Sequence, residues 1–216
     1  MEPGVADILL RSRQNVLDIL DERGYDVAPY RNIAPDQILT LDENQARALD
    51  IFVKQKPGGP APCDRAVVIH MYWKRIRLSL GTFVRDIFKE FEGTPNEVRK
   101  TDDIIVILNE EYHEAFDKAS IQMWQKEKVR MTFFHIKQLV IHPGKHVLVP
   151  PHRKLTSEEA KAEMARLHIS QRAQLPLIKH HDIQSRVLGL VPGDVVEILR
   201  PSATAGVERY LRLCAA

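Results

Sequence analysis

Residues 146–159 read HVLVPPHRKLTSEE and carry the clearest local structural signal in the chain. Thr156 and Glu159 have the spacing of a capping box, in which each side chain accepts a backbone N–H at a helix start. We therefore predict a helix that begins here and runs to about Leu167. The two prolines before it favour a stiff, extended segment that presents its side chains with little ordering cost.

The residues after this helix predict a helical turn and a β-hairpin. Residues 183–188 favour one short helical turn, which Gly189 ends. Residues 195–199 and 207–213 have the composition of strands, and residues 201–206 between them have the composition of a turn. We expect an antiparallel hairpin with a long turn, and we expect the glycines of this region at sharp turns or at positive φ.

The first 143 residues alternate between helix-like and strand-like segments. An amphipathic pattern at residues 5–23, with Gly24 where a left-handed cap would lie, predicts a helix. The residues between 55 and 64 are rich in proline and glycine and predict a loop. The same criteria predict helices at 82–91 and 110–127 and buried strands at 66–72, 104–108 and 131–141. This alternation is typical of an α/β sheet domain.

The length of 216 residues allows one or two domains, each with its own core. Pro143 and Gly144 interrupt the chain between the two patterns described above. We predict an α+β protein overall, with an N-terminal α/β domain at residues 1–143 and a compact C-terminal α+β domain at residues 144–216.

The composition excludes several classes of protein. Hydrophobic residues make up 44% and charged residues 28%, as in soluble globular chains. No apolar run approaches the roughly 20 residues that cross a bilayer, and no signal sequence is recognisable, so we expect neither a membrane protein nor a secreted one. The net charge of +2 is too small for an autonomous nucleic-acid binder. Cys63 and Cys214 are expected to be ordinary thiols.

The nine histidines form no recognisable metal-binding pattern. The spacing of His135, His142, His146 and His152 matches no common zinc site, and Pro143 prevents the second and third from sharing a helix face. The sequence also has no GxSxG motif, no activated cysteine and no phosphate-binding glycine loop. We expect no catalytic residue, no metal and no cofactor.

Asp102 and Asp103 precede a predicted strand, as carboxylates do in metal-dependent nucleases. Such sites also need an acid and a lysine two residues apart on an adjacent strand, and no such pair occurs near these strands. We therefore expect the two aspartates to lie in a solvated turn or at a loop end. A nuclease-like enzyme is the less favoured alternative.

Two blocks of sequence resemble one known family. Residues 146–159 fit the pattern H-x-(aliphatic)-V-P-x-H-x-x-(aliphatic)-x-x-(acid)-E, with an unusual Val147, and residues 182–189 and 192–206 read D-x-x-x-R-x-x-G and PGDVVEILRPSATAG. This combination resembles the RNA polymerase subunit that archaea call H and that eukaryotic nuclear polymerases share as the fifth subunit. Ile183 and Leu211 depart from its usual residues.

The N-terminal part resembles only the eukaryotic form of this family. Residues 21–25 read DERGY, similar to the turn that opens the jaw domain, which the archaeal form lacks. The residues between 27 and 103 match no motif of the family. A divergent source, such as a large DNA virus with its own polymerase, would explain this, and the alternative is an ordinary lineage whose sequence has drifted.

The resemblance implies a non-catalytic subunit of a multisubunit DNA-directed RNA polymerase. Residues 144–216 would be the assembly domain that docks on the largest subunit. Residues 1–143 would be the lower jaw, with a restriction-endonuclease-like sheet and weak contact to downstream DNA. The resemblance implies the nucleus as location, or the virion or host cytoplasm for a viral chain. A transient polymerase-binding regulator is a further alternative.

The resemblance also implies which residues contact the other polymerase subunits, because these are the positions that match the family motifs. They are His146, Pro150, His152, Glu159, Asp182, Arg186, Gly189, Gly193, Arg200, Ser202, Thr204 and Gly206.

Overall fold

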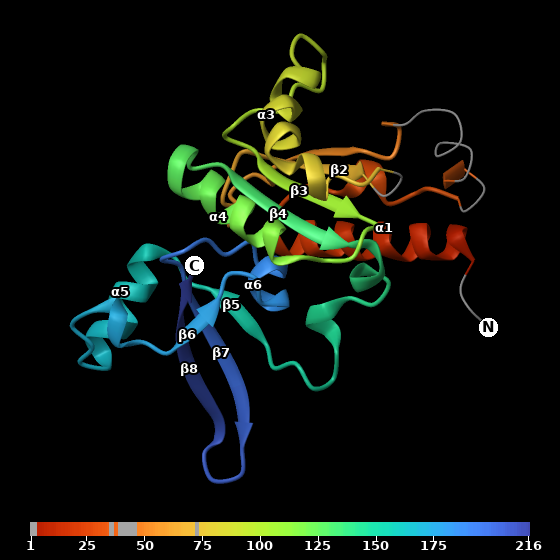
Figure 1. The fold of residues 1–216 in the computed structure, drawn as a ribbon. Coiled ribbons are helices and arrows are strands. Elements are labelled where there is room, and N and C mark those ends of the chain that lie inside the picture. Colours follow the sequence, from red (N-terminus) through yellow and green to blue (C-terminus); the bar gives the residue numbers. More distant parts are fainter. Residues whose placement is uncertain (1–3, 35–36, 39–46, 72–73) are drawn as a thin grey trace. The chain divides into compact units, whose positions relative to one another are not determined.

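The computed structural model describes residues 4–34, 37–38, 47–71 and 74–216 (Figure 1). The contacts of the chain divide it into two compact units, Met1–His142 and Pro143–Ala216. This division lies next to the expected boundary after Pro143, and the roles expected for the two domains stay predictions. Each unit combines helices with a four-stranded sheet, which confirms the α+β class. Within the described ranges, no helix has the length and apolar character needed to cross a membrane.

The sheet of the N-terminal unit has the strand order β1-β2-β3-β4. β1 is antiparallel to β2, whereas β2, β3 and β4 are parallel to one another. Every residue of β3 is buried, because parallel strands carry helices on their faces and read as continuous apolar runs. The strands are β1 (Ile51–Lys54), β2 (Arg65–Met71), β3 (Asp103–Leu108) and β4 (Arg130–His135).

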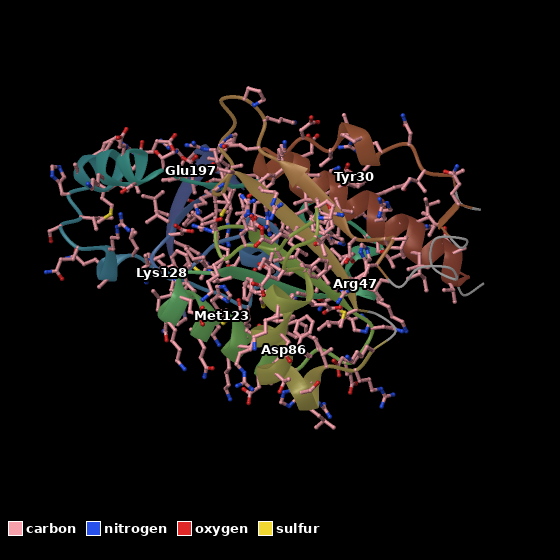
Figure 2. All side chains as sticks on the ribbon, turned by 90° about the horizontal axis from the view of Figure 1, so that it is seen from above. Tyr30, Arg47, Asp86, Met123, Lys128 and Glu197 are labelled. Atoms are coloured by element: carbon pink, nitrogen blue, oxygen red, sulfur yellow. The ribbon has the colours of Figure 1, made fainter. Side chains whose placement is uncertain are left out.

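Among the described residues of this unit, α1 (Val5–Arg23), α3 (Leu80–Glu90) and α4 (Glu114–Glu127) are α-helices with described bounds. α3 and α4 share one apolar core with the parallel strands, to which Met123 of α4 contributes (Figure 2). The helix predicted at 82–91 is thus confirmed with a two-residue earlier start. Of the strand predicted at 66–72, Tyr72 lies outside the described residues.

The helix predicted at 5–23 is confirmed, together with its cap. Gly24 has φ 99°, and the N–H groups of Gly24 and Tyr25 donate to carbonyls of the last helical turn. A Cβ at Gly24 would come within 2.8 Å of Pro60, so the loop predicted at 55–64 packs directly on this cap. Glycine is therefore required here by both conformation and space.

Two predicted elements of this unit have wrong boundaries, because local side-chain bonds compete with them. The helix predicted from Glu110 begins at Glu114, since His113 caps it and the Glu110 carboxylate accepts the N–H groups of Ile76 and Arg77. The strand predicted at 131–141 ends at His135, whose side chain and that of Gln138 form a capping box that starts a 3-10 helix. In the described part of this unit the 3-10 helices are Ala28–Tyr30, Arg77–Ser79 and Ile136–Leu139, and the C-terminal unit contains Pro143–Lys145 and Arg172–Gln174.

The C-terminal unit has a second sheet with the order β5-β7-β8-β6. The predicted hairpin is confirmed, but its turn is shorter than expected, since the strands pair as far as Ser202 and Gly206. Gly206 at φ 72° and a bond from the Ala205 N–H to the Ser202 hydroxyl close this turn. The elements are β5 (His152–Lys154), α5 (Ser157–Arg166), β6 (Leu177–Lys179), α6 (Ile183–Val187), β7 (Val195–Ser202) and β8 (Gly206–Ala215).

The two faces of this sheet belong to separate small cores. Leu155, Val195 and Leu211 join residues of α5 in one core, whereas Val196 and Ile198 lie in the other. Neighbouring residues of β7 thus enter opposite cores, as the alternation along a strand requires.

The expectation that Asp102 and Asp103 are solvated is wrong. Asp102 is 3% and Asp103 1% exposed. Asp103 accepts a bond from Arg23 at 2.7 Å, and Asp102 forms an ion pair with Arg65 at 2.6 Å. Burial of a carboxylate is tolerated when a guanidinium and further donors compensate the lost water. Burial and the neighbouring Asp103 charge also raise the pKa of Tyr25, whose hydroxyl donates to that aspartate.

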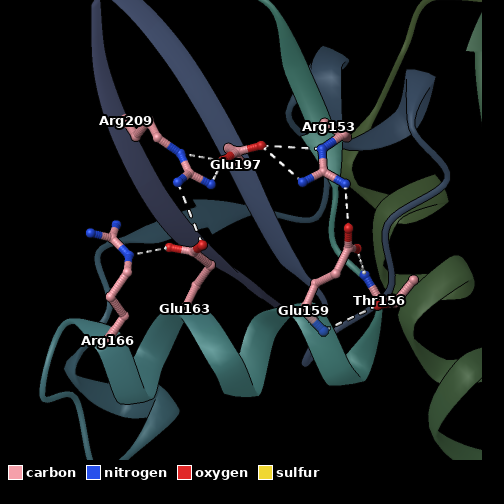
Figure 3. A network of polar contacts seen from close by, with 7 residues as sticks. All are labelled: Arg153, Thr156, Glu159, Glu163, Arg166, Glu197 and Arg209. Atoms are coloured by element: carbon pink, nitrogen blue, oxygen red, sulfur yellow. Dashed lines mark hydrogen bonds and ion pairs between the residues drawn. The ribbon is translucent and has the colours of Figure 1, made fainter.

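A network of ion pairs holds α5 to the sheet of the C-terminal unit (Figure 3). At its centre Glu197 of β7, with a side chain only 6% exposed, binds Arg153 of β5 and Arg209 of β8. Arg153 also binds Glu159 at 2.7 Å, and Arg209 reaches Glu163 of α5 at 3.5 Å. Charged groups of opposite sign thus link three strands and one helix.

The predicted capping box is part of this network. The Thr156 hydroxyl accepts the Glu159 N–H, and the Glu159 carboxylate accepts the Thr156 N–H at 2.8 Å. The hydrogen bond from Arg153, and then the one from the Thr156 backbone, lower the pKa of Glu159 to about 2. The carboxylate therefore stays ionised in the folded unit far below neutral pH.

Asp103→Ala is expected to destabilise the protein by about 3–5 kcal/mol, because it leaves the buried Arg23 guanidinium without its counter-charge. Urea unfolding measures this loss. Asp7→Ala breaks the exposed pair with Arg11 and is the matched control, with an expected loss below about 1 kcal/mol. Equal losses in the two variants would contradict a structural role of the buried pair.

Glu159→Gln is expected to make the free energy of unfolding decrease less steeply as the pH is lowered. The pKa of Glu159 is lower in the folded chain than the ordinary 4.5, so its stabilisation is present above about pH 4.5 and is lost as the pH falls towards 2. Urea unfolding across this pH range compares the variant with wild type. Glu158→Gln at the adjacent exposed position is the control, and an identical pH dependence in Glu159→Gln and wild type would refute the interpretation.

Candidate partner-binding surface

The described residues offer no arrangement typical of an active site or a metal centre. Nowhere in the ranges that the structure describes do three or more His, Cys, Asp or Glu side chains lie together so that they could hold a metal ion. Asp102 and Asp103, the carboxylates of the nuclease-like alternative, are bound by arginines. Cys63 and Cys214 are free, and burial raises the pKa of both thiols, to about 11 and about 12. Such thiols stay protonated near neutral pH.

Half of the predicted contact residues serve the fold of the C-terminal unit. Asp182 caps α6 by accepting the Gln184 N–H at 2.8 Å, and Arg186 in that helix is 6% exposed. Gly189, Gly193 and Gly206 have φ values of 61°, 99° and 72°, as predicted. With Glu159 in the capping box, these six positions shape the unit. The burial of Arg186 favours a structural role for it over direct contact with a partner.

The other half of the predicted residues are exposed or half-buried and fall on two neighbouring segments. His146, Pro150 and His152 lie on the segment before α5. The Leu199 N–H of β7 donates a hydrogen bond to the Pro151 carbonyl of this segment. The remaining three are Arg200, Ser202 and Thr204, in the end of the β7–β8 hairpin that includes its turn (Figure 1). The register His152↔Ile198 brings the two segments together on one edge of the sheet.

His152 and Arg200 are each held in one orientation. His152 Nδ1 lies 2.6 Å from the Pro150 carbonyl oxygen, so this nitrogen carries the proton and donates it. Burial lowers the pKa of His152, which keeps the ring neutral near neutral pH. The Arg200 guanidinium lies over the Tyr210 ring, 5.1 Å from its centroid. The segment before α5 and the hairpin thus present a preorganised imidazole and a preorganised cation.

Exposed apolar side chains, which the sequence pattern does not distinguish from core residues, accompany these residues. Val147 is 90%, Leu148 82%, Val207 63% and Tyr210 36% exposed. All four lie in the two segments that carry the exposed motif positions. An apolar residue in a strand-like pattern is normally assigned to the core, so only the structure distinguishes these from buried ones. Exposed apolar groups beside polar ones are typical of protein-binding surfaces.

Comparisons with known proteins agree with the resemblance noted from the motifs. The model of the family "RNA polymerase Rpb5, C-terminal domain" matches residues 141–214. The subunit rpabc1 of DNA-directed RNA polymerases I, II and III from Dictyostelium discoideum is 29% identical over 206 residues, which cover 95% of this chain and 96% of that protein.

Archaeal and animal relatives show the same relationship over shorter stretches. Subunit Rpo5 of the DNA-directed RNA polymerase of Pyrococcus abyssi is 52% identical over 69 residues, 32% of this chain and 83% of the archaeal protein. RPABC1 of Caenorhabditis elegans is 40% identical over 84 residues, 39% of this chain and 38% of that protein. The chain therefore belongs to the family of the fifth subunit of DNA-directed RNA polymerase, the Rpb5 and Rpo5 family, whose members are non-catalytic subunits.

Proposed function

We propose that the C-terminal unit docks this non-catalytic subunit on the largest polymerase subunit and that the N-terminal unit forms a jaw near downstream DNA. The observation that carries the proposal is the extent of the archaeal match. It is 69 residues long, about the length of the C-terminal unit, and it covers most of an archaeal polymerase subunit. The family match at residues 141–214 falls almost entirely on the C-terminal unit, so we expect this unit to contain the assembly contacts.

The surface of the C-terminal unit supports this assignment. Its exposed motif residues lie on the segment before α5 and on the hairpin, together with exposed apolar side chains. Stable subunit interfaces combine an apolar centre with a few aromatic and arginine anchors. Tyr210 and Arg200, stacked on each other, fit that description.

For the N-terminal unit we propose a restriction-endonuclease-like sheet without nuclease chemistry. The mixed sheet, with one antiparallel strand beside three parallel ones, supports this architecture. The buried Asp102 and Asp103 are engaged by arginines, which supports a structural role for them. Because the relatives named for polymerases I, II and III are eukaryotic, we propose the nucleus as the location.

The basic loop at residues 74–77 is the part of the N-terminal unit that we expect nearest to DNA. Lys74, Arg75 and Arg77 are exposed, whereas Ile76 between them is fully buried. Glu110 Oε1 accepts the N–H groups of Ile76 at 2.8 Å and of Arg77 at 3.0 Å, which fixes the loop backbone. The exposed cations of this loop can contact phosphates without reading the base sequence.

Deletion of residues 1–142 is expected to leave binding to the largest subunit nearly unchanged, whereas Arg200→Ala in the full chain is expected to weaken it about tenfold. Co-purification with tagged polymerase and a binding titration measure both effects. Lys161→Ala, at an exposed position of α5, is the control for Arg200. A fragment 143–216 that is folded by circular dichroism but unbound would show that the roles of the two units are reversed. Substoichiometric, salt-labile recovery of the full chain would indicate a transient regulator.

Replacing Lys74, Arg75 and Arg77 together by alanine is expected to lower crosslinking to downstream DNA and to reduce its dependence on salt, because up to three phosphate contacts are lost. Site-specific photocrosslinking of assembled polymerase at two salt concentrations measures this. Lys118→Ala, which removes a cation paired with Glu114 on α4, is the control. Unchanged crosslinking in the triple variant would remove the basic loop from the proposed DNA path.

A further inference from the structure

The end of the β7–β8 hairpin that includes its turn has no neighbouring strand on either side in the described part of the chain. β7 and β8 pair from Val195↔Leu213 to Ser202↔Gly206. β5 pairs with β7 only at residues 196–198, and β6 pairs with β8 only at residues 213–215. Unpaired strand edges of this kind are templates on which another strand can add.

The direction of the backbone groups follows from bonds at the base of the hairpin. The Leu213 N–H donates to the Pro176 carbonyl on the β6 side, and the Cys214 N–H donates to the Asp194 carbonyl on the β7 side. Because these directions alternate along a strand, Leu211, Arg209 and Val207 direct their backbone groups towards the β6 side. The Val207 N–H donates to the Ala205 carbonyl within the turn. The Arg209 N–H and C=O thus lie in the middle of an open edge.

The opposite edge of the hairpin is closed by a proline. Leu155 donates to the Val195 carbonyl and Leu199 donates to the Pro151 carbonyl, so the odd-numbered residues of β7 face β5. The next odd-numbered position is Pro201, which has no N–H to offer. Proline on an edge prevents strand addition, so only the β8 edge can accept a strand.

We propose that the edge of β8 at residues 207–211 accepts an extended segment of the largest polymerase subunit as an additional strand. This inference rests on the proposed docking role of the C-terminal unit and gives its mode of recognition. Main-chain bonds to Arg209 supply affinity, and alternate side chains supply specificity. The exposed Val207 on one face favours an apolar side chain in the incoming strand, and Arg212 on the other face favours an acidic one.

We assign the occupant to the largest subunit because the same hairpin carries the exposed or half-buried family positions Arg200, Ser202 and Thr204, which belong to the surface proposed to dock on it. These positions lie within residues 141–214, which match the family "RNA polymerase Rpb5, C-terminal domain". The open edge is therefore continuous with the surface that we assign to assembly. A second copy of this chain, pairing edge to edge, is the competing occupant.

The test compares Arg209→Pro with Arg209→Ala in the full chain. Both variants lose the ion pair with Glu197, but only the proline removes the outward N–H and places a ring on the open edge. Neither change touches the ladder to β7, so thermal unfolding is expected to give similar midpoints. In binding titrations with the largest subunit we expect Arg209→Pro to bind about tenfold more weakly than Arg209→Ala. Equal binding of two folded variants would overturn the proposal.

Residue-resolved hydrogen exchange of the wild-type chain tests the same edge without any substitution. In the free chain the Arg209 amide is expected to exchange fast and the Tyr210 amide slowly, because Tyr210 pairs with Ile198 in the ladder. In assembled polymerase the Arg209 amide is expected to become protected at least about tenfold.

The outcomes separate this inference from the function on which it rests. A chain that is bound in polymerase but has a fast Arg209 amide overturns strand addition and leaves the docking role intact. A wild-type chain that does not bind polymerase overturns the docking role itself. Protection in the free chain that rises with concentration, together with a dimer by light scattering, shows a second copy as occupant and also overturns the proposal.

Discussion

The ladder between β7 and β8 is the constraint on which the C-terminal unit depends. Its eight residue pairs fix where β5 and β6 can add at the base of the hairpin, and they place Val195 and Val196 in opposite cores. The same ladder extends beyond both neighbours and carries Arg200 and Tyr210 into solvent. One element therefore organises the interior and presents the surface proposed for assembly.

Buried carboxylates held by arginines recur in both units. Glu197 joins three strands of the C-terminal unit, and Asp103 joins β3 to the end of α1 in the N-terminal unit. A charge removed from water needs an opposite charge and hydrogen bonds close to it. Arg23 and Asp103 are 80 positions apart, so the rule that charged residues lie outside failed for Asp103 because its partner could not be seen locally.

The functional assignment and the surface were predictable to different degrees. The capping box at Thr156 and the glycine turns are local patterns, and the structure contains them. The family motifs, through the resemblance that they carry, led to a polymerase subunit, which the comparisons confirm. The motif positions alone did not reveal which residues meet a partner. A residue can match the family motif because it shapes the fold, as Gly193 does, or while it lies on the surface, as Arg200 does. The motif alone does not distinguish the two cases.

The sequence by itself determined the helices with their caps, the central strands, the hairpin and the family, because each depends on residues close together in the chain or on a continuous pattern. Only the tertiary structure decided the short strands β1, β5 and β6, the burial of Asp102 and Arg186, and the open edge beside Arg209. These features are set by which distant segments pair and in which register. The free energy of strand pairing comes from contacts between residues far apart in sequence, so local propensity does not predict it.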